Sequence, residues 1–193
     1  TSLIAGDYTC TITDDNGCIM IKDMFVDEPL PITIPIITTD ISCNGGSNGI
    51  ATATPSGGTG PYTFLWSDVD STLTPTITGL SAASYTVTVT DVIGCFSVSS
   101  TITINEPSLI TATGNISHVS CYNGNNGAIS LSVSGGNAPY TYLWSNNQTT
   151  LNATSLTSGT YSVVITDLTG CTPVFSYDVD EPLFALSASL VIS

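Results

Sequence analysis

The chain has 193 residues and carries 15 Asp and Glu against a single Lys or Arg, so its formal net charge at pH 7 is −14. Binding to a phosphate backbone needs clustered basic side chains, so this composition excludes nucleic acid as a partner and disfavours anionic lipid surfaces. No apolar run approaches the length of a membrane-spanning helix. The acidity indicates a solvated surface or cation binding, and we favour simple solubility.

A phrase near the N-terminus is repeated along the chain. Residues 7–18 read DYTCTITDDNGC, and close variants return at 84–95 and 160–171. A second phrase, GGTGPYTFLWS at 57–67, returns as GGNAPYTYLWS at 135–145. A Glu-Pro pair follows each copy of the first phrase. The chain is therefore predicted to be a tandem array of repeats of about 75–78 residues.

This register divides the chain into whole and partial repeats. Residues 1–29 form the C-terminal part of one repeat, 30–107 and 108–182 are complete repeats, and 183–193 supply the first strand of another. Half-repeats at both ends, with no initiating Met and no signal peptide, predict a segment of a longer repetitive protein. The alternative is a complete protein whose strands exchange between neighbouring copies.

Alternating side chains predict the strands of each repeat. In YTVTVT at 85–90, Tyr85, Val87 and Val89 share one face and threonines share the other, as in a sandwich strand with one face in water. The D-x-x-G turn that follows leads into a second strand. Each repeat is thus predicted to be an immunoglobulin-like sandwich of about seven antiparallel strands in two sheets, with almost no helix.

Aromatic side chains alternate along one strand of each complete repeat and are expected to point into the core. They are Tyr62, Phe64, Trp66, Tyr140, Tyr142 and Trp144. Leu-x-x-x-x-Tyr places Tyr8, Tyr85 and Tyr161 at a corner where the hydroxyl returns to nearby backbone. Stacking of the two tryptophans on sugar rings is the alternative, but the alternation favours core packing. Two intervening leucines, Leu65 and Leu143, face outward and are candidates for contacts between repeats or filaments.

Six cysteines in so acidic a chain indicate an oxidising compartment. Their placement predicts one bond inside each complete repeat, Cys43–Cys95 and Cys121–Cys171, each closing a loop of about 50 residues. Cys18 occupies the Cys95 position, so its partner is expected upstream of residue 1. Cys10 replaces an inward Val, and we expect a small buried hydrophobe there in preference to a Cys10–Cys18 bridge.

The motifs in combination resemble a known family. The order C-N-G-x-x-N-G, G-G-x-x-P-Y-x-[FY]-L-W, L-x-x-x-x-Y and T-D-x-x-G-C, closed by E-P, resembles the SprB repeat of giant cell-surface adhesins from gliding and related Bacteroidetes bacteria. The resemblance covers essentially all of the chain. It implies a very large protein exported by the type IX secretion system and displayed as extracellular filaments, some of which the gliding machinery carries along the surface. The departures are Cys10 and the Asn residues at 48 and 126, where the family commonly has Asp, and the loss of that carboxylate weakens a calcium site there.

Carboxylates at the junctions between repeats are candidate calcium ligands. They are Asp27, Glu28, Glu106, Asp180 and Glu181, together with the turn residues Asp14, Asp91 and Asp167. Calcium takes six to eight oxygens, which one Glu and one Asp per junction do not supply without backbone carbonyls and water. The alternative, which we favour, is that Glu-Pro ends one repeat and rigidly starts the next.

The function predicted from these features is a non-catalytic structural stalk of a long extracellular adhesin filament for cell-surface attachment or gliding motility. One His and one Lys give no recurring base or nucleophile constellation, so no enzymatic activity is expected. The alternative is a carbohydrate-binding or other ligand-binding surface module. The expected partners are neighbouring repeats, other filament chains and surface polysaccharide, with no membrane insertion, no cofactor beyond the calcium considered above, and candidate O-glycosylation at Ser71.

Overall fold

The computed structural model describes residues 3–185, and within that range every regular element is a β-strand. The all-β prediction is confirmed. None of the described segments forms a helix long and apolar enough to cross a membrane.

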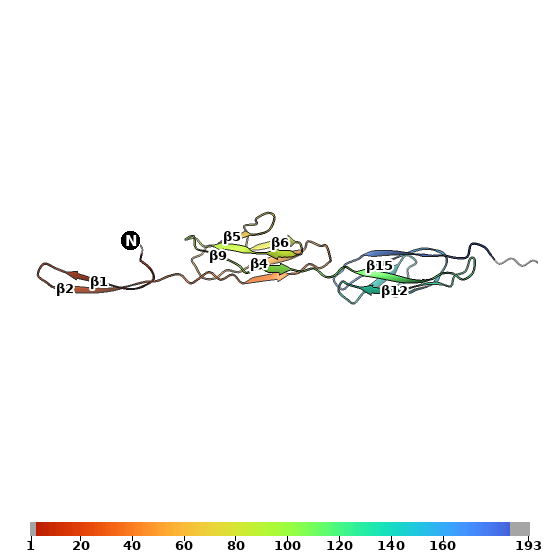
Figure 1. Cartoon of the computed structure of the whole chain (residues 1–193), viewed down its shortest axis with the longest axis horizontal. Coiled ribbons are helices and arrows are strands. Elements are labelled where there is room, and N and C mark those ends of the chain that lie inside the picture. Colours follow the sequence, from red (N-terminus) through yellow and green to blue (C-terminus); the bar gives the residue numbers. More distant parts are fainter. Residues whose placement is uncertain (1–2, 186–193) are drawn as a thin grey trace, which may run out of the picture. The chain divides into compact units, whose positions relative to one another are not determined.

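The described strands fall into a hairpin and two larger groups (Figure 1). The hairpin and the first repeat contain β1 (Gly6–Thr13), β2 (Ile19–Val26), β3 (Ile36–Thr39), β4 (Gly49–Ala53), β5 (Thr63–Trp66), β6 (Thr76–Leu80), β7 (Ala83–Tyr85), β8 (Val87–Thr90), β9 (Phe96–Val98) and β10 (Ile102–Ile104). The second repeat contains β11 (Thr111–Ser117), β12 (Gly127–Ser134), β13 (Thr141–Trp144), β14 (Ala153–Leu156), β15 (Gly159–Thr166) and β16 (Val174–Val179). The strand expected within 183–193 lies, from residue 186 on, outside the described residues.

The strands form small sheets, and contacts between Cα atoms group the chain into two compact units. The sheet orders are β1-β2, β3-β4-β6, β5-β8-β9, β7-β10, β11-β12-β14 and β13-β15-β16. Unit 1 takes in the residues up to 37, 52–77 and 85–102. Unit 2 takes in 38–51, 78–84 and the residues from 103 on, so it contains the whole second repeat and three segments of the first.

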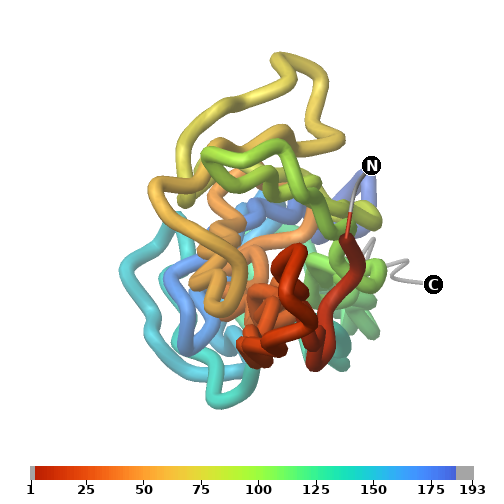
Figure 2. The backbone as a smooth tube through the Cα atoms, turned by 90° about the vertical axis from the view of Figure 1, so that its left-hand side faces the viewer, coloured from red at the N-terminus to blue at the C-terminus, as the bar shows by residue number. Residues whose placement is uncertain are grey.

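The N-terminal hairpin in unit 1 pairs β1 with β2 antiparallel, from Gly6 opposite Val26 to Thr13 opposite Ile19 (red in Figure 2). Almost all of its side chains are exposed on both faces. Tyr8 makes the predicted corner, because its hydroxyl donates to the carbonyl oxygen of Ile4 at 2.8 Å.

Two strands of the first repeat are interrupted where the second repeat has continuous ones. From the turn cysteine to Glu-Pro, the first repeat is one residue longer than the second. The break falls at Ser99, whose N–H donates to the carbonyl of Val87 while its hydroxyl accepts from the N–H of Val87. An extra residue in one strand of a pair produces such a bulge, which explains why β9 and β10 are separate strands.

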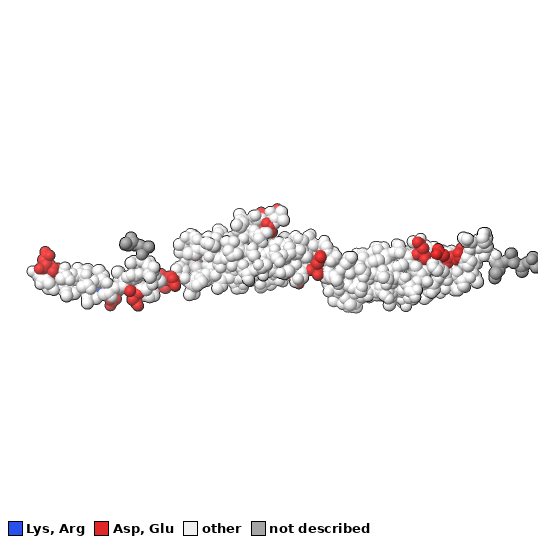
Figure 3. All heavy atoms as spheres, viewed as in Figure 1, with Lys and Arg blue, Asp and Glu red and all other residues white. Residues whose placement is uncertain are grey.

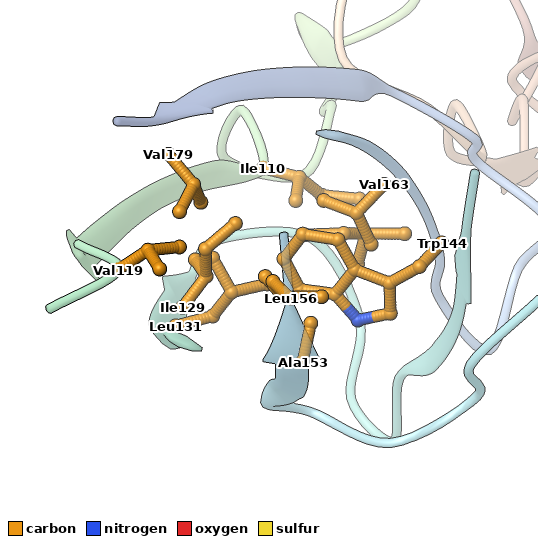
Figure 4. Packing of buried hydrophobic residues seen from close by; sticks show 10 residues of the cluster. Ile110, Val119, Ile129, Leu131, Trp144, Ala153, Leu156, Val163 and Val179 are labelled. Atoms are coloured by element: carbon orange, nitrogen blue, oxygen red, sulfur yellow. The ribbon is translucent and has the colours of Figure 1, made fainter. Parts of the chain in front are cut away.

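The second repeat is a sandwich of two three-stranded sheets, β11-β12-β14 and β13-β15-β16. Side chains from both sheets meet in one core, in which Ile129, Trp144 and Val163 are almost fully buried (Figure 4). The hydroxyl of Tyr177 on β16 donates to the carbonyl of Ala112 on β11 and so ties the two sheets together. The immunoglobulin-like sandwich is therefore confirmed, although this repeat has six strands and not the seven or so predicted.

The predicted aromatic strands lie as expected. Trp66 and Trp144 are each 1% exposed, and their indole N–H groups donate to the carbonyls of Thr74 and Thr150. The other four aromatics, Tyr62, Phe64, Tyr140 and Tyr142, are half-buried. On the opposite face Leu65 and Leu143 are about half exposed, at 49% and 52%. Burial of both indoles rules out their stacking on sugar rings, so the core interpretation was right.

Candidate functional site

A buried aspartate organises the T-D-x-x-G-C turn of the second repeat. Asp167 follows β15 and is only 5% exposed. Its Oδ1 accepts from the backbone N–H of Thr169 at 2.9 Å and of Cys171 at 3.0 Å, and its Oδ2 accepts from the N–H of Asn137 at 2.9 Å. The carboxylate therefore holds Cys171 in place and joins this turn to the G-G-x-x-P-Y loop.

The first repeat builds the same turn in unit 1. Asp91 accepts from the N–H of Ile93 at 3.0 Å, of Cys95 at 2.8 Å and of Thr59 at 3.0 Å. In both repeats the second glycine of the Gly-Gly pair lies against this carboxylate. A Cβ on Gly58 or Gly136 would lie 2.9 Å from the aspartate Oδ2, and both glycines have positive φ. The two sequence motifs therefore recur together because they form one interlocked structure.

These hydrogen bonds also set the ionisation of the two aspartates. The N–H of Thr59 contributes most to lowering the pKa of Asp91, and the N–H groups of Cys95 and Ile93 add to it against an opposing effect of burial. Burial acts to raise the pKa of Asp167, but the amides of Asn137, Cys171 and Thr169 outweigh it, and the net pKa is lowered. Both side chains are therefore structural carboxylates that lose their charge at a lower pH than an ordinary aspartate does.

A glutamate holds the other cysteine loop of each repeat. The Oε2 of Glu106 accepts from the N–H of Gly45 at 2.6 Å, and the Oε2 of Glu181 accepts from the N–H of Asn123, also at 2.6 Å. The side-chain amide of Asn44 donates to the carbonyl of Pro107 at 3.1 Å. The Glu-Pro that closes each repeat is therefore bonded to the loop that carries Cys43 or Cys121.

Within unit 2 these two kinds of cysteine turn are joined covalently. Cys43 forms a disulfide with Cys171, 128 residues further along, with their Cα atoms 5.6 Å apart. Beside it the Thr169 hydroxyl lies 3.0 Å from the carbonyl oxygen of Ser42 and 2.9 Å from Oδ1 of Asp167, so its one proton is shared between two acceptors. The bond links the first sequence repeat to the second.

The predicted pairs Cys43–Cys95 and Cys121–Cys171 are therefore wrong, since Cys95 and Cys121 are free and exposed. The reason is visible in the second repeat. Cys171 precedes the first residue of β16, whereas the Cys121 loop lies at the other end of that strand, where the N–H of Val119 donates to the carbonyl of Asp180. Six residues of strand span roughly 20 Å, and a disulfide needs Cα atoms within about 7 Å.

The two cysteines of the hairpin also differ from expectation. Cys10 lies on β1 opposite Lys22, and it is free and exposed, so it is not the buried hydrophobe that we expected. Cys18 is free and exposed as well, so no Cys10–Cys18 bridge forms. The side-chain Oδ1 of Asp14 accepts from the N–H of Cys18 at 2.8 Å, which is the same turn geometry as at Asp91 and Asp167.

The structure disperses the candidate calcium ligands. On the face seen in Figure 3 the acidic side chains lie in small separate groups. Asp27 accepts from the N–H of Glu28, and Asp180 lies 3.5 Å from Nδ1 of His118, while Asp91, Asp167, Glu106 and Glu181 bind backbone amides as described above. Among residues 3–185 no three His, Cys, Asp or Glu side chains come together as a group that could hold a metal ion. Apart from Asp180, the role found for these carboxylates is to accept hydrogen bonds from backbone N–H groups.

Comparison with known proteins finds a family match in two segments of the chain. A family model described as the SprB repeat matches residues 36–71 and 113–149. A search of curated proteins finds no match.

Solved structures similar to this chain match it with low sequence identity and low TM-scores. An amphioxus IgVJ-C2 molecule is 16% identical with a TM-score of 0.30, over 75% of this chain and 95% of that one. Extracellular domains 3–5 of Drosophila OTK are 14% identical with a TM-score of 0.34, over 91% and 70%. A Dscam structure is 10% identical with a TM-score of 0.31, over 91% of this chain and 54% of that one.

Proposed function

We propose that this chain, two segments of which match the SprB repeat, serves as a non-catalytic structural stalk in a long extracellular adhesin displayed at the cell surface, used for attachment or gliding. The observation that carries the proposal is the Cys43–Cys171 disulfide. Added to the continuous backbone, a disulfide between consecutive repeats carries a pulling force past the 128-residue loop that it closes, so that loop does not extend when noncovalent contacts break. Such coupling suits a tether that bears load.

The polar contacts around the bond support the same role. The Glu106 carboxylate and the Asn44 amide both fasten the Cys43 loop to the segment that leads into the second repeat. No Gly/Ser-rich or Pro-rich spacer separates the repeats in the sequence. A chain built in this way resists bending and stretching at the point where a flexible linker would give way.

The chemistry of the polar groups supports a non-catalytic role. Asp91 and Asp167 are the buried charged residues of the described chain, and each binds three backbone amides, which leaves them no free role as acid or base. The only His, His118, accepts a hydrogen bond on Nδ1 from the N–H of Asp180 and is exposed. These groups are engaged in hydrogen bonds with the backbone.

The proposal is tested by immunogold electron microscopy of the producing cells with an antibody against residues 108–182. Labels on filaments at a distance from the cell envelope support a stalk, and labels confined to the envelope or the cell interior contradict it. In a parallel assay, purified chain with its disulfide intact is applied to glycan arrays and abiotic surfaces. A stalk shows no saturable binding, whereas saturable binding to one glycan class establishes a ligand-binding module in its place.

A further inference from the structure

We propose that Cys121 and Cys95 each form a disulfide equivalent to Cys43–Cys171, and that the other cysteine of each bond belongs to an adjacent repeat. In a tandem array, the cysteine of each C-x-[GN]-G loop then pairs with the cysteine of the T-D-x-x-G-C turn in the repeat that follows. Every repeat is then disulfide-bonded to both of its neighbours, and no repeat has a disulfide within itself. This inference rests on the proposed stalk only in assuming that such repeats follow one another.

The loop around Cys121 reproduces the bonded loop around Cys43. Each loop is fastened by a glutamate to a backbone N–H at 2.6 Å, as described above. In each, the N–H of the serine before the cysteine donates to an asparagine Oδ1 at 3.1 Å, Ser42 to Asn48 and Ser120 to Asn126. The loop that carries Cys121 is therefore held by the same hydrogen bonds as the loop that carries Cys43.

The turn around Cys95 reproduces the bonded turn around Cys171. In each turn the aspartate Oδ1 accepts from the N–H of the cysteine, at 2.8 Å for Cys95 and 3.0 Å for Cys171. The aspartate Oδ2 binds the amide that follows the Gly-Gly pair in both repeats. Both halves of the missing bonds are therefore preformed, each with its cysteine exposed.

The surfaces beside the free cysteines Cys121 and Cys95 each correspond to one side of the pocket beside the Cys43–Cys171 disulfide. A pocket of about 310 Å³ adjoins the disulfide in unit 2, and its walls include Cys43, Asn44, Pro107, Leu109, Cys171 and Thr172. The depression beside Cys121 is lined by Tyr122, Pro182 and Phe184, which occupy the positions of Asn44, Pro107 and Leu109 in the repeat register. The depression beside Cys95 in unit 1 is lined by Pro29, Pro31 and Phe96, which occupy those of Pro107, Leu109 and Thr172.

The partner is a repeat joined in sequence and not a second molecule. The pocket beside the Cys43–Cys171 disulfide is lined by residues 107–110, the segment that connects one repeat to the next. A second copy docked through Cys95 would bring its own residues 28–32 to this place, which residues 182–185 of the first copy already occupy. Two segments would then compete for one position.

The bond forms by oxidation of two thiols with a small-molecule or protein disulfide as the electron acceptor. One cysteine thiolate attacks the acceptor disulfide and releases one acceptor thiol. The second cysteine thiolate then displaces the other acceptor thiol from the mixed disulfide. The two cysteines lose two protons and two electrons in all, and the acceptor disulfide becomes two thiols.

The test uses a chain extended by one repeat, residues 1–182 followed by a second copy of 108–193. In the appended copy Val174→Ile, at an exposed position of β16, marks the peptide that contains its Cys171. After oxidation with glutathione disulfide, the bonds are mapped by mass spectrometry under nonreducing conditions. We expect Cys43 bonded to the original Cys171, Cys121 bonded to the marked Cys171, and Cys95 free.

Several results overturn the inference. They are a Cys121–Cys171 bond inside one repeat, a disulfide-linked dimer, or Cys121 and the marked Cys171 both remaining as thiols while Cys43–Cys171 forms. The variant Cys121→Ser in the original copy alone is expected to free the marked thiol and no other, whereas a bond inside the appended repeat would leave the marked thiol paired in this variant. If the extended chain does not fold, alkylation of the native 193-residue chain still decides. Labelling of Cys95 and Cys121 without labelling of Cys43 and Cys171 is required, and any other pattern refutes the register while leaving the stalk to the microscopy above.

Discussion

Removal of the Cys43–Cys171 disulfide is expected to lower the free energy of unfolding by an amount that the loop length sets. The bond closes a loop with a sequence separation of 128 residues. In the chain-entropy model a loop of this length stabilises the folded state by about 5 kcal/mol at 25 °C, and measured bridges typically give about 2–4 kcal/mol. The variant Cys43→Ser should lose an amount in this range because its denatured chain is no longer closed.

The assay is equilibrium guanidinium denaturation followed by tryptophan fluorescence under oxidising conditions. The variants Cys43→Ser and Cys171→Ser should lose the same free energy, and the double variant should lose no more, since all three remove one bond. The matched control is Cys121→Ser, which changes the equivalent but free cysteine of the second repeat and should leave the midpoint unchanged. If Cys95→Ser destabilises the chain as much as Cys43→Ser does, the pairing described here is wrong.

Three further outcomes follow from the core and the turns. The variant Trp144→Ala should lose about 3–5 kcal/mol in the same denaturation assay, because it empties the centre of the second core, whereas Leu143→Ala on the exposed face should change little. Because the pKa of Asp167 is lowered in the folded chain, its stabilising effect is fully present above the carboxyl's ordinary pKa in the unfolded chain and is lost as pH falls through the folded value. The variant Asp167→Asn should therefore be less stable at neutral pH, and its melting temperature should fall less steeply as the pH is lowered. The variant Glu181→Gln should speed hydrogen exchange at the amide of Asn123, whereas Glu28→Gln should leave that amide unchanged.

Local features of the sequence were sufficient to predict the β-strands and the core side chains. Alternation along a strand fixes which side chains share a face, so Val87, Val89 and Trp66 were placed in the core correctly. The tyrosine corners at Tyr8 and Tyr161 also follow from local spacing, and both hydroxyls bind the carbonyl four residues upstream. The bulge at Ser99 was not predicted, although a one-residue difference in length between the repeats signals it.

The cysteine pairing failed because it depends on which end of a strand each cysteine occupies. Counting one pair per repeat ignored the direction of β16, which separates the Cys121 loop from the Cys171 turn. The strand between Cys171 and Glu-Pro could have shown this, since its length alone exceeds the reach of a disulfide. The roles of Glu106 and Glu181 were missed for a similar reason, because each binds an amide about 60 residues earlier in the chain.

Single-molecule stretching of the chain, held at residues 1 and 193, tests the central claim most directly. The disulfide hides the loop between Cys43 and Cys171, and at about 3.6 Å per residue its 128 residues amount to roughly 460 Å of contour length. Reduction under load should therefore release about 460 Å in one step, and Cys43→Ser should show no hidden length. Two separate releases of about 180 Å each, as bonds inside each repeat would give, would contradict the covalent coupling of one repeat to the next.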